Sequence, residues 1–321
     1  MTFDDSYGVQ LATKLEMQLR QPRSDLSTKL VNNDYEGEFF RIGDTVQIVK
    51  PDMDSVTVTD GAKSKARPTA TELDFANRTL QIDRSMAYAF FISDINVAEN
   101  SKWNYESLGL DQVAQKMRTT HNLRLANLIA NDTTITRIGT PAAPITCADG
   151  DEFFKKVLTK CYATLYNQGA IDGNAHYTYG SNPTEQHRTR ASLFMPMDGY
   201  VELLTSKYFT DRSTDKADEK VETADIGKVL GMEIGIEPAL SSNAAIEEKI
   251  TVTSLAEDAF VVIAGTANCV TRASKVLKPE VMRDQDNFQD NYYGLEIYGE
   301  KVFQPKTAVV AFVKIGTAAS S

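Results

Sequence analysis

The chain has 321 residues, more than one small hydrophobic core needs, so one large domain or two closely joined domains are expected. Hydrophobic residues make up 42% of it, enough for a sizeable core, and the formal net charge of −10 is opposite to that of proteins that bind DNA by neutralising phosphates. No stretch approaches the ~20 apolar residues that cross a bilayer and no secretory signal begins the chain, so a soluble intracellular protein is expected.

Residues 1–34 are predicted to form an N-terminal arm. Leu11, Leu15 and Leu19 fall four positions apart, on one face of a short helix that Pro22 would end. The rest of the arm holds few apolar side chains, too few to pack by themselves. We therefore expect the arm to lie on a neighbouring subunit, with these three leucines among its contacts.

Residues 43–92 are β in character. Apolar and polar residues alternate at Val46 and Ile48, at Val56 and Val58, and at Leu80 and Ile82. Between the last two pairs lies a turn-rich tip, residues 60–68, with the cations Lys63, Lys65 and Arg67 and no large apolar side chain. This pattern predicts a long β-hairpin. A thin hairpin buries little of its own surface, so its strands, and the three cations, are expected to contact another subunit.

The clearest helix spans residues 106–131. Its apolar stripe at 3.6-residue spacing, which should face the core, consists of Leu110, Val113, Ala114, Met117, His121, Leu125 and Leu128. Lys116 and Asn127 should lie on the outer side. A helix of this length is roughly 35–40 Å long, which is typical of a scaffold element.

Shorter elements follow this helix. We predict a helix over 151–166 that Gly169 ends, a buried strand at 192–196, a helix from 197 to 204, a charged loop at 210–225, a strand pair punctuated by Gly227, Gly231 and Gly235, and buried strands at 260–264 and 308–313. The inner face of the first of these helices should carry Phe154, Val157, Leu158, Cys161 and Leu165.

Three acidic residues near the C-terminus resemble cation ligands: Asp284, Asp286 and Asp290. An EF-hand loop starting at Asp284 would need a glycine where Gln289 stands and a ligand where Phe288 stands. A solvated acidic loop is therefore the preferred interpretation.

No other pattern indicates a catalytic, cofactor or metal site. The histidines are His121, His176 and His187, and the cysteines are Cys147, Cys161 and Cys269. The histidines lack zinc-binding spacing, and His121 is expected at the polar margin of the helix stripe. The cysteines form no CxxC pair, so buried or idle thiols are expected. Gly227-Lys228 is followed by Val229 and not by Ser or Thr, which excludes a Walker phosphate loop.

The order of these elements resembles the major capsid proteins of tailed phages, which have the Hong-Kong-97-type fold. The segments that carry the resemblance are 43–46 through 93–94, 108–131, Leu193-Phe194-Met195-Pro196, 200–204, 227–234, 270–275, 280–283 and 294–305. In that family an N-terminal arm precedes a long β-hairpin called the extended loop. A spine helix and an apical domain follow, and the chain then returns to a peripheral domain.

The resemblance implies an α+β phage capsid fold and a division of the chain. The parts would be an N-terminal arm at 1–34, an extended hairpin loop at 45–91, a peripheral domain at 35–44, 92–150 and 281–316 with the spine helix at 106–131, and an apical domain at 151–280. Some relatives crosslink subunits through a hairpin lysine and an apical asparagine. Lys63 and Lys65 lie at the tip here, but two lysines on a polar loop are more simply explained as solvated.

The implied function is that of a major capsid protein. Many copies would assemble in the host cytoplasm, as hexamers and pentamers, into the icosahedral shell of a virion. The shell would enclose double-stranded DNA without sequence-specific binding, catalysis, cofactor or membrane. Scaffolding, portal and decoration proteins would be separate partners, unless a scaffolding segment has been removed from this chain. Two alternatives stay open: an encapsulin-like nanocompartment shell that loads a protein cargo, and a soluble α/β enzyme of unknown class.

Overall fold

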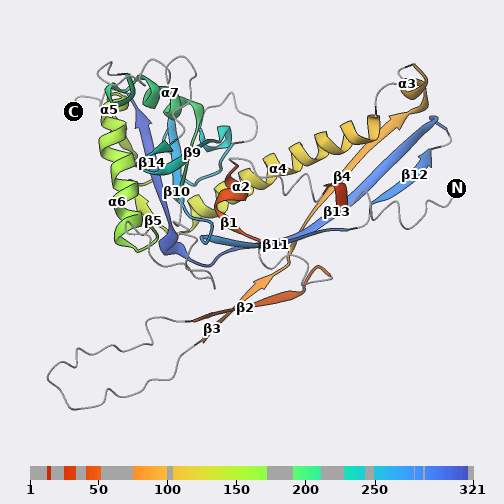
Figure 1. Ribbon diagram of the computed structural model, residues 1–321, viewed down its shortest axis with the longest axis horizontal. Coiled ribbons are helices and arrows are strands. Elements are labelled where there is room, and N and C mark those ends of the chain that lie inside the picture. The colour runs from red at the N-terminus through yellow and green to blue at the C-terminus, as the bar shows by residue number, and fades with distance from the viewer. Residues whose placement is uncertain are drawn as a thin grey trace, which may run out of the picture.

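A computed structural model describes residues 13–15, 25–33, 41–51, 75–99, 104–171, 191–210, 228–242, 249–277, 279–284 and 286–316. Figure 1 shows a compact part, at the left, and a narrow extension, at the right. The extension is formed by β4 (Arg84–Ser93), β12 (Glu280–Asp284), β13 (Gln289–Val302) and α3 (Asp94–Glu99). Each part is built around its own sheet. Within the described residues no helix is both long and apolar enough to cross a membrane.

A seven-stranded sheet forms the centre of the compact part. Across the sheet the strands are β5 (Thr136–Ile138), β14 (Ala308–Ile315), β10 (Ala259–Gly265), β7 (Ser192–Met195), β9 (Met232–Ile236) and β8 (Lys228–Val229), and β6 (Ile145–Cys147) also pairs with β14. Every residue of β7 and β10 is buried, because both faces of the sheet are covered. The expected buried strands at 192–196, 260–264 and 308–313 are confirmed, and β8 and β9 form the expected strand pair.

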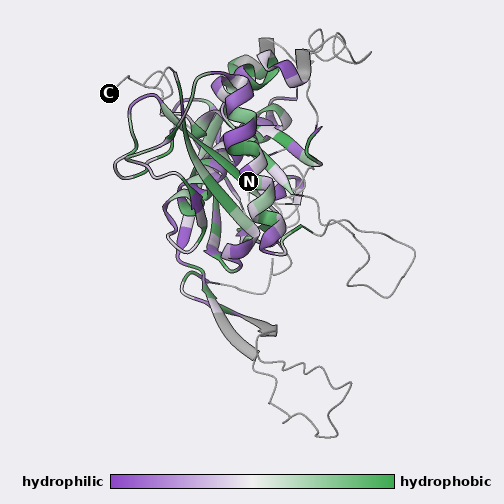
Figure 2. Ribbon diagram, turned by 90° about the vertical axis from the view of Figure 1, so that its left-hand side faces the viewer, coloured by the Kyte–Doolittle hydropathy of each residue, from purple (hydrophilic) through white to green (hydrophobic). Residues whose placement is uncertain are grey.

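Helices cover the two faces of this sheet. On one face lie α5 (Gly150–Phe153), the π-helical turn η2 (Phe154–Leu158), α6 (Thr159–Asn167) and α7 (Met197–Thr205), and on the other lie α2 (Leu26–Lys29), α4 (Tyr105–Asn131) and the short 3-10 helix η3 (Pro238–Leu240). Helix α8 (Lys207–Thr210) follows α7, and the 3-10 helix η4 (Pro305–Thr307) joins β13 to β14. Alternate side chains of β10 point to opposite faces of the sheet and pack in two different hydrophobic cores. Val262 packs in the core that contains Val157 of η2, and Val261 in the core that contains Ala126 of α4. In Figure 2 the green, hydrophobic ribbon is concentrated in these central strands.

The helix predicted over 151–166 is present as α5, η2 and α6, with one difference at its start. Phe153 is fully buried, whereas Phe154 is partly buried and stacks on Tyr208, with ring centroids 4.5 Å apart. The π-helical turn changes the helical register between the residues before it and those after it. The inner-face residues beyond Phe154 are buried as expected: Val157, Leu158, Cys161 and Leu165.

A second, five-stranded sheet reaches from the compact part into the extension. Its strands are β1 (Val31–Asn32), β11 (Val270–Val276), β12 (Glu280–Asp284), β13 (Gln289–Val302) and β4 (Arg84–Ser93). The long strand β13 pairs with β11 and β12 along one edge and with β4 along the other. Helix α3 (Asp94–Glu99) follows β4 at the far end of the extension (Figure 1).

Helix α4 (Tyr105–Asn131) connects the two parts. It has 27 residues and is therefore about 40 Å long. As predicted, Leu110 and Met117 are buried and Lys116 is exposed. Leu128 is partly buried against the core. Asn127, expected on the outer side, is also partly buried, because its Oδ1 accepts a hydrogen bond of 2.6 Å from the backbone N–H of Thr251.

Met117 gives a direct test of the helix stripe. Its side chain is 3% exposed and packs with Leu15 and Val276. We expect Met117→Ala to lower the free energy of unfolding by about 2–5 kcal/mol, because it removes buried volume that its neighbours cannot fill completely. Denaturant unfolding of the soluble subunit measures this change. Lys116→Ala, at the adjacent exposed position, is the control and should alter the midpoint little. Equal midpoints for the two variants would show that the stripe is assigned to the wrong face.

Strands β2 (Thr45–Pro51) and β3 (Phe75–Gln81) form the base of a hairpin, as predicted. Residues 52–74, which include the tip, lie outside the described residues. The base is anchored by a small core of Val46, Leu80 and Ile82 with Ile297 and Phe303. Gly299 of β13 allows this contact, because a Cβ atom there would lie 2.3 Å from the backbone oxygen of Gln81.

The chain after Gln81 does not continue the hairpin, in contrast to the expectation of a hairpin loop over residues 45–91. Pairing with β2 ends at Gln81, and β4 pairs instead with β13, from Arg84 opposite Tyr298 to Ser93 opposite Gln289. Apolar side chains of β4 then pack against α4. A strand between β13 and α4 buries more surface than one in a two-stranded hairpin, which explains the difference.

Candidate assembly surfaces

The sheet of the extension has one covered face and one exposed face. Met86, Tyr88, Phe90 and Ile92 of β4 are partly buried on the side of α4. The alternate residues of β4 are exposed on the other side, where β13 and β12 contribute their cross-strand neighbours. We call this patch the exposed sheet face and define it as Ala87, Ala89, Phe91, Glu280, Met282 and Tyr293. Phe91 is 62% exposed and Met282 58%. Large apolar side chains exposed on one face of a sheet are typical of a surface that contacts another protein.

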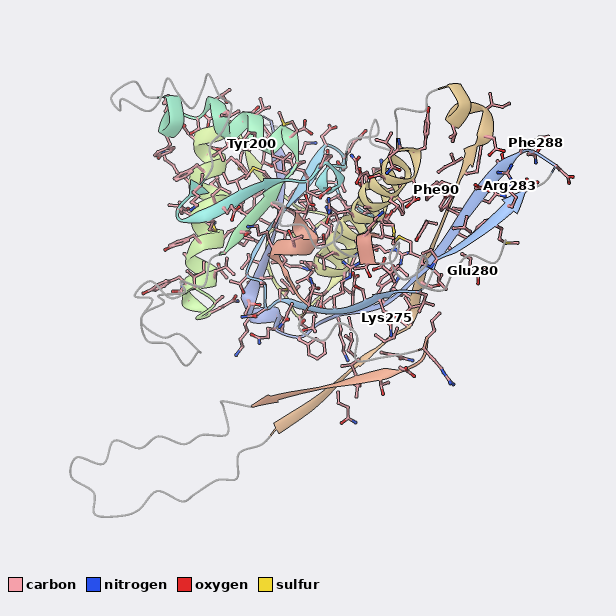
Figure 3. All side chains as sticks on the ribbon, turned by 45° about the vertical axis from the view of Figure 1, so that its right-hand side comes forward. Phe90, Tyr200, Lys275, Glu280, Arg283 and Phe288 are labelled. Carbon is pink, nitrogen blue, oxygen red and sulfur yellow. The ribbon has the colours of Figure 1, made fainter. Side chains whose placement is uncertain are left out.

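The far end of the extension carries further exposed apolar side chains. Phe288, in the turn between β12 and β13, is 66% exposed and has a positive φ of 48°, an uncommon conformation for a bulky residue. Ile95 and Val97 of α3 are exposed beside it in the chain segment that follows β4. Figure 3 shows Phe288 and Arg283 at this end, remote from Tyr200 in the compact part. We call Ile95, Val97 and Phe288 the distal end.

Ionic contacts order the distal end. Arg283 Nη1 donates hydrogen bonds to Asp94 Oδ1 at 2.8 Å and to Asp290 Oδ1 at 3.1 Å. The bond from Arg283 holds the pKa of Asp94 below its usual value. These contacts join the start of α3 to β12 and β13, so the apolar side chains are presented on an ordered framework.

The three aspartates considered as cation ligands belong to this same turn. Asp284 Oδ1 accepts from the backbone N–H of Asp286 at 3.1 Å, and its Oδ2 accepts from Asn287 at 2.9 Å. Asp290 is paired with Arg283. Carboxylate oxygens of Asp284 and Asp290 therefore accept from donors of their own chain. The described part of the chain contains no group of three or more His, Cys, Asp or Glu side chains placed to hold a metal.

A groove of about 730 Å³ lies between α4 and β4, lined by side chains such as Phe90, Leu108 and Val113. Leu15 is fully buried next to it, with Met117 and Val276. We had predicted Leu15 as a contact between subunits, but its side chain is in the core of its own chain, because α4 already offers an apolar surface within reach. The other predicted contacts, Leu11, Leu19, Lys63, Lys65 and Arg67, lie outside the described residues.

A buried ionic cluster, not foreseen from the sequence, holds the second sheet against α4. His121 Nε2 donates to Glu296 Oε2 at 2.8 Å, and its Nδ1 lies 4.0 Å from Glu300 Oε1. Arg272 Nη2 lies 3.7 Å from Glu296 Oε1, and Arg272 Nε 3.5 Å from Glu300 Oε1. The side chains of these four residues are at most 9% exposed. The expectation that His121 sits at a polar margin is thus wrong: its ring is enclosed, with Tyr298 edge-on at 4.9 Å.

Charges within this ionic cluster determine its protonation. Burial and the charge of Arg272 lower the pKa of His121, against the opposite influence of the two glutamates. Burial raises the pKa of Glu296, but the hydrogen bond and charge of His121 and the charge of Arg272 outweigh it, so that this pKa is lowered overall. Both shifts remove stability as the pH falls, since protonation is then easier in the unfolded chain. Such a cluster is a structural joint between α4, β11 and β13.

The remaining candidates are buried as the sequence predicted. Cys147, Cys161 and Cys269 are free and buried, and burial raises the pKa of Cys147 to about 11 and those of Cys161 and Cys269 to about 12. Thiols with raised pKa values are poor nucleophiles at neutral pH. Sequence reasoning missed Phe91 and Phe288. Three consecutive apolar residues, Phe90 to Ile92, were the available signal, because a strand in a two-stranded hairpin rarely needs both of its faces to be apolar.

No family model matches the chain, and no curated protein sequence matches it. Solved structures do match. A structure from Mycobacterium phage Che8 has a TM-score of 0.59 at 19% identity, covering 88% of each chain. The mature capsid of bacteriophage PhiM1 matches with a TM-score of 0.56 at 12% identity, and the match covers 90% of this chain and 86% of the phage chain. A virus-like particle from Pyrococcus furiosus matches with a TM-score of 0.50 at 13% identity, and the match covers 95% of this chain and 99% of the other. These matches span nearly the whole chain and confirm the expected α+β phage capsid fold.

Proposed function

We propose that this chain is a major capsid protein whose copies form hexamers and pentamers of an icosahedral shell around double-stranded DNA. The observation that carries the proposal is the likeness of the fold, over 90% of the chain, to the mature capsid of PhiM1. A role as a structural protein of a virion follows from it, with no catalytic activity. Scaffolding, portal and decoration proteins would be separate partners, and assembly would take place in the host cytoplasm.

The uncovered surfaces of the subunit support this proposal. The exposed sheet face and the distal end place large apolar side chains in solvent, and a second copy of the chain would remove them from water. We also propose the division into an arm at 1–34, an extended loop, a peripheral domain and an apical domain, with the extended loop ending before β4. The arm and the loop would connect neighbouring subunits.

An encapsulin-like compartment shell is the second candidate. The likeness to a virus-like particle from Pyrococcus furiosus is the observation behind it, but its TM-score of 0.50 is lower than the 0.56 of the PhiM1 capsid, so the compartment ranks second. Both candidate functions require a closed protein shell, and they differ in what the shell encloses. Purified particles that contain nucleic acid would support the capsid, whereas particles that contain a protein cargo would support the compartment.

Sedimentation tests the shell function. The expressed protein, with a scaffolding protein supplied if one is needed, should sediment as shells or capsomers in analytical ultracentrifugation. Phe288→Ser should remain folded and shift the population towards slowly sedimenting subunits, because it removes an apolar contact of the distal end. Tyr166→Ser is the matched control: Tyr166 is 50% exposed on α6, in the compact part, and its replacement should leave the sedimentation profile unchanged.

The two possible failures of this experiment have different meanings. A wild-type protein found only as a compact monomer would overturn the shell proposal itself. Normal shells from Phe288→Ser, with wild-type shells also present, would keep the shell proposal and remove the distal end from its contacts.

A further inference from the structure

Helix α2 packs against α4 and the segment that follows β9. We call the surface that these two elements offer to α2 its seat. Leu26 and Leu30 are fully buried there. Asn122 of α4 joins the two sides of the seat. Its Oδ1 accepts the backbone N–H of Ser27 at 3.1 Å, and its Nδ2 donates to Glu237 Oε2 at 2.9 Å. The position of α2 is therefore coupled, through one amide side chain, to a buried carboxyl group.

The three carboxylates described around α2 differ in their partners. Arg118 Nε lies 3.3 Å from Asp25 Oδ2, and Lys29 Nζ lies 3.0 Å from Glu233 Oε2. Each of these carboxylates thus has a cation beside it. Glu237, which is 7% exposed, is bonded instead by neutral groups: the Asn122 amide and the backbone N–H of Ala239. When Glu237 is ionised, its negative charge therefore lies in a buried site, whereas Asp25 and Glu233 remain partly exposed to water.

We propose that Glu237 is a proton-controlled latch for α2: its neutral carboxyl group keeps α2 seated, and its ionisation releases α2 together with the following strand β1. The direction of this effect follows from the burial of Glu237 and from the neutral groups that donate to it: ionisation would place a charge in a buried site, and release of α2 would return that charge to water. Burial, and then the charge of Asp25, raise the pKa of Glu237 to about 7. The latch would therefore operate near neutral pH.

The sign of the pH dependence follows from the raised pKa. Release of α2 returns Glu237 to water and towards its ordinary pKa of 4.5, so seating is strongest in acid and weakens as the pH rises to about 7. Between pH 6 and pH 8 these two values allow an increase in the opening equilibrium of up to about tenfold. His121, which adjoins Asn122 in the chain, faces Glu296 on β13, and its lowered pKa acts in the opposite direction and at lower pH.

Hydrogen–deuterium exchange of the full chain, followed by mass spectrometry at pH 6 and pH 8, tests the latch. After correction for intrinsic exchange rates, the amides of residues 26–32 should lose protection by up to about tenfold at the higher pH in the wild type. Glu237→Gln keeps an acceptor for Asn122 without a charge, so its protection should be equal at both pH values. Glu233→Gln is the matched control on the same seat and should retain the pH dependence of the wild type.

The amides of residues 125–130 in α4 serve as an internal reference, and they should not change between the two pH values. A parallel change in α4, an unchanged α2 in the wild type, or a persisting pH dependence in Glu237→Gln would each overturn the latch. Asp25→Asn offers a second test that does not depend on the folding of the glutamine variant. It removes one cause of the raised pKa of Glu237, so the midpoint of the transition should move to lower pH. An unmoved midpoint would also overturn the proposal.

Discussion

A chain that lacks residues 61–67 is expected to fold and yet to form no closed shells. The deleted stretch holds three cations and no large apolar residue, so the sequence gives it no means of packing on its own subunit. The two cores of the compact part and the joint between α4 and β13 lie elsewhere. The free energy of unfolding should therefore stay close to that of the wild type, whereas the contact that this loop makes with a neighbouring subunit is lost.

Two measurements test the effect of the deletion on folding and on assembly. The unfolding midpoint of the soluble subunit should be unchanged, and ultracentrifugation under assembly conditions should show open or misdirected products instead of shells. In the wild type, trypsin should cleave at Lys63, Lys65 and Arg67 in the free subunit, and assembly should protect these bonds. Equal cleavage rates in subunits and shells, or normal shells from the deleted chain, would exclude the hairpin from the assembly mechanism.

A charge variant separates the role of the cations from that of the loop length. Replacing Lys63, Lys65 and Arg67 by glutamine keeps the loop and removes the charges that would meet the acidic surface of a neighbour. If the cations act electrostatically, assembly of this variant should be weaker than that of the wild type, and the difference should shrink at high salt. A difference that is independent of salt would show that the contact between subunits depends on the backbone of the loop and not on its charges.

Periodicity was a good guide wherever an element packs on one continuous apolar surface. The stripe of α4 around Leu110 and Met117 and the uninterrupted apolar run of β10 both predicted their burial correctly. Periodicity does not say which partner a strand takes. Large and small or polar residues alternate in β2 and in the first part of β4, yet β2 pairs with β3 and β4 with β13. The long strand β13 decides between these arrangements, and the alternation does not.

Buried polar contacts could not be predicted for a related reason. His121 and Glu296 are 175 positions apart, and each by itself reads as a polar residue at the margin of an element. Only the fold brings them together with Arg272. The exposed residue Phe288 escaped prediction because apolar side chains are normally assigned to the core, whereas a subunit that assembles keeps some of them for its neighbours.

Arg272→Met is expected to lower the free energy of unfolding by about 3–5 kcal/mol at pH 8, because it leaves Glu296 and Glu300 buried without their guanidinium partner. Methionine retains most of the apolar volume beside Tyr298, so the loss reports the charge and not a cavity. The deficit should shrink as the pH falls towards 5. Without Arg272, one of the charges that lower the pKa of Glu296 and of His121 is gone, and both groups take up protons more readily in the folded variant.

Denaturant unfolding at pH 5 and pH 8 measures this difference, and two further variants make it specific. Arg283→Met removes an arginine that also contacts two carboxylates, but at the solvent-exposed distal end, so its effect should be far smaller and nearly independent of pH in this range. The double variant Arg272→Met with Glu296→Gln removes one of the two uncompensated charges and should recover part of the lost stability, which a double-mutant cycle quantifies. A deficit of equal size at both pH values, or no recovery in the double variant, would show that Arg272 stabilises the joint by packing and not by its charge.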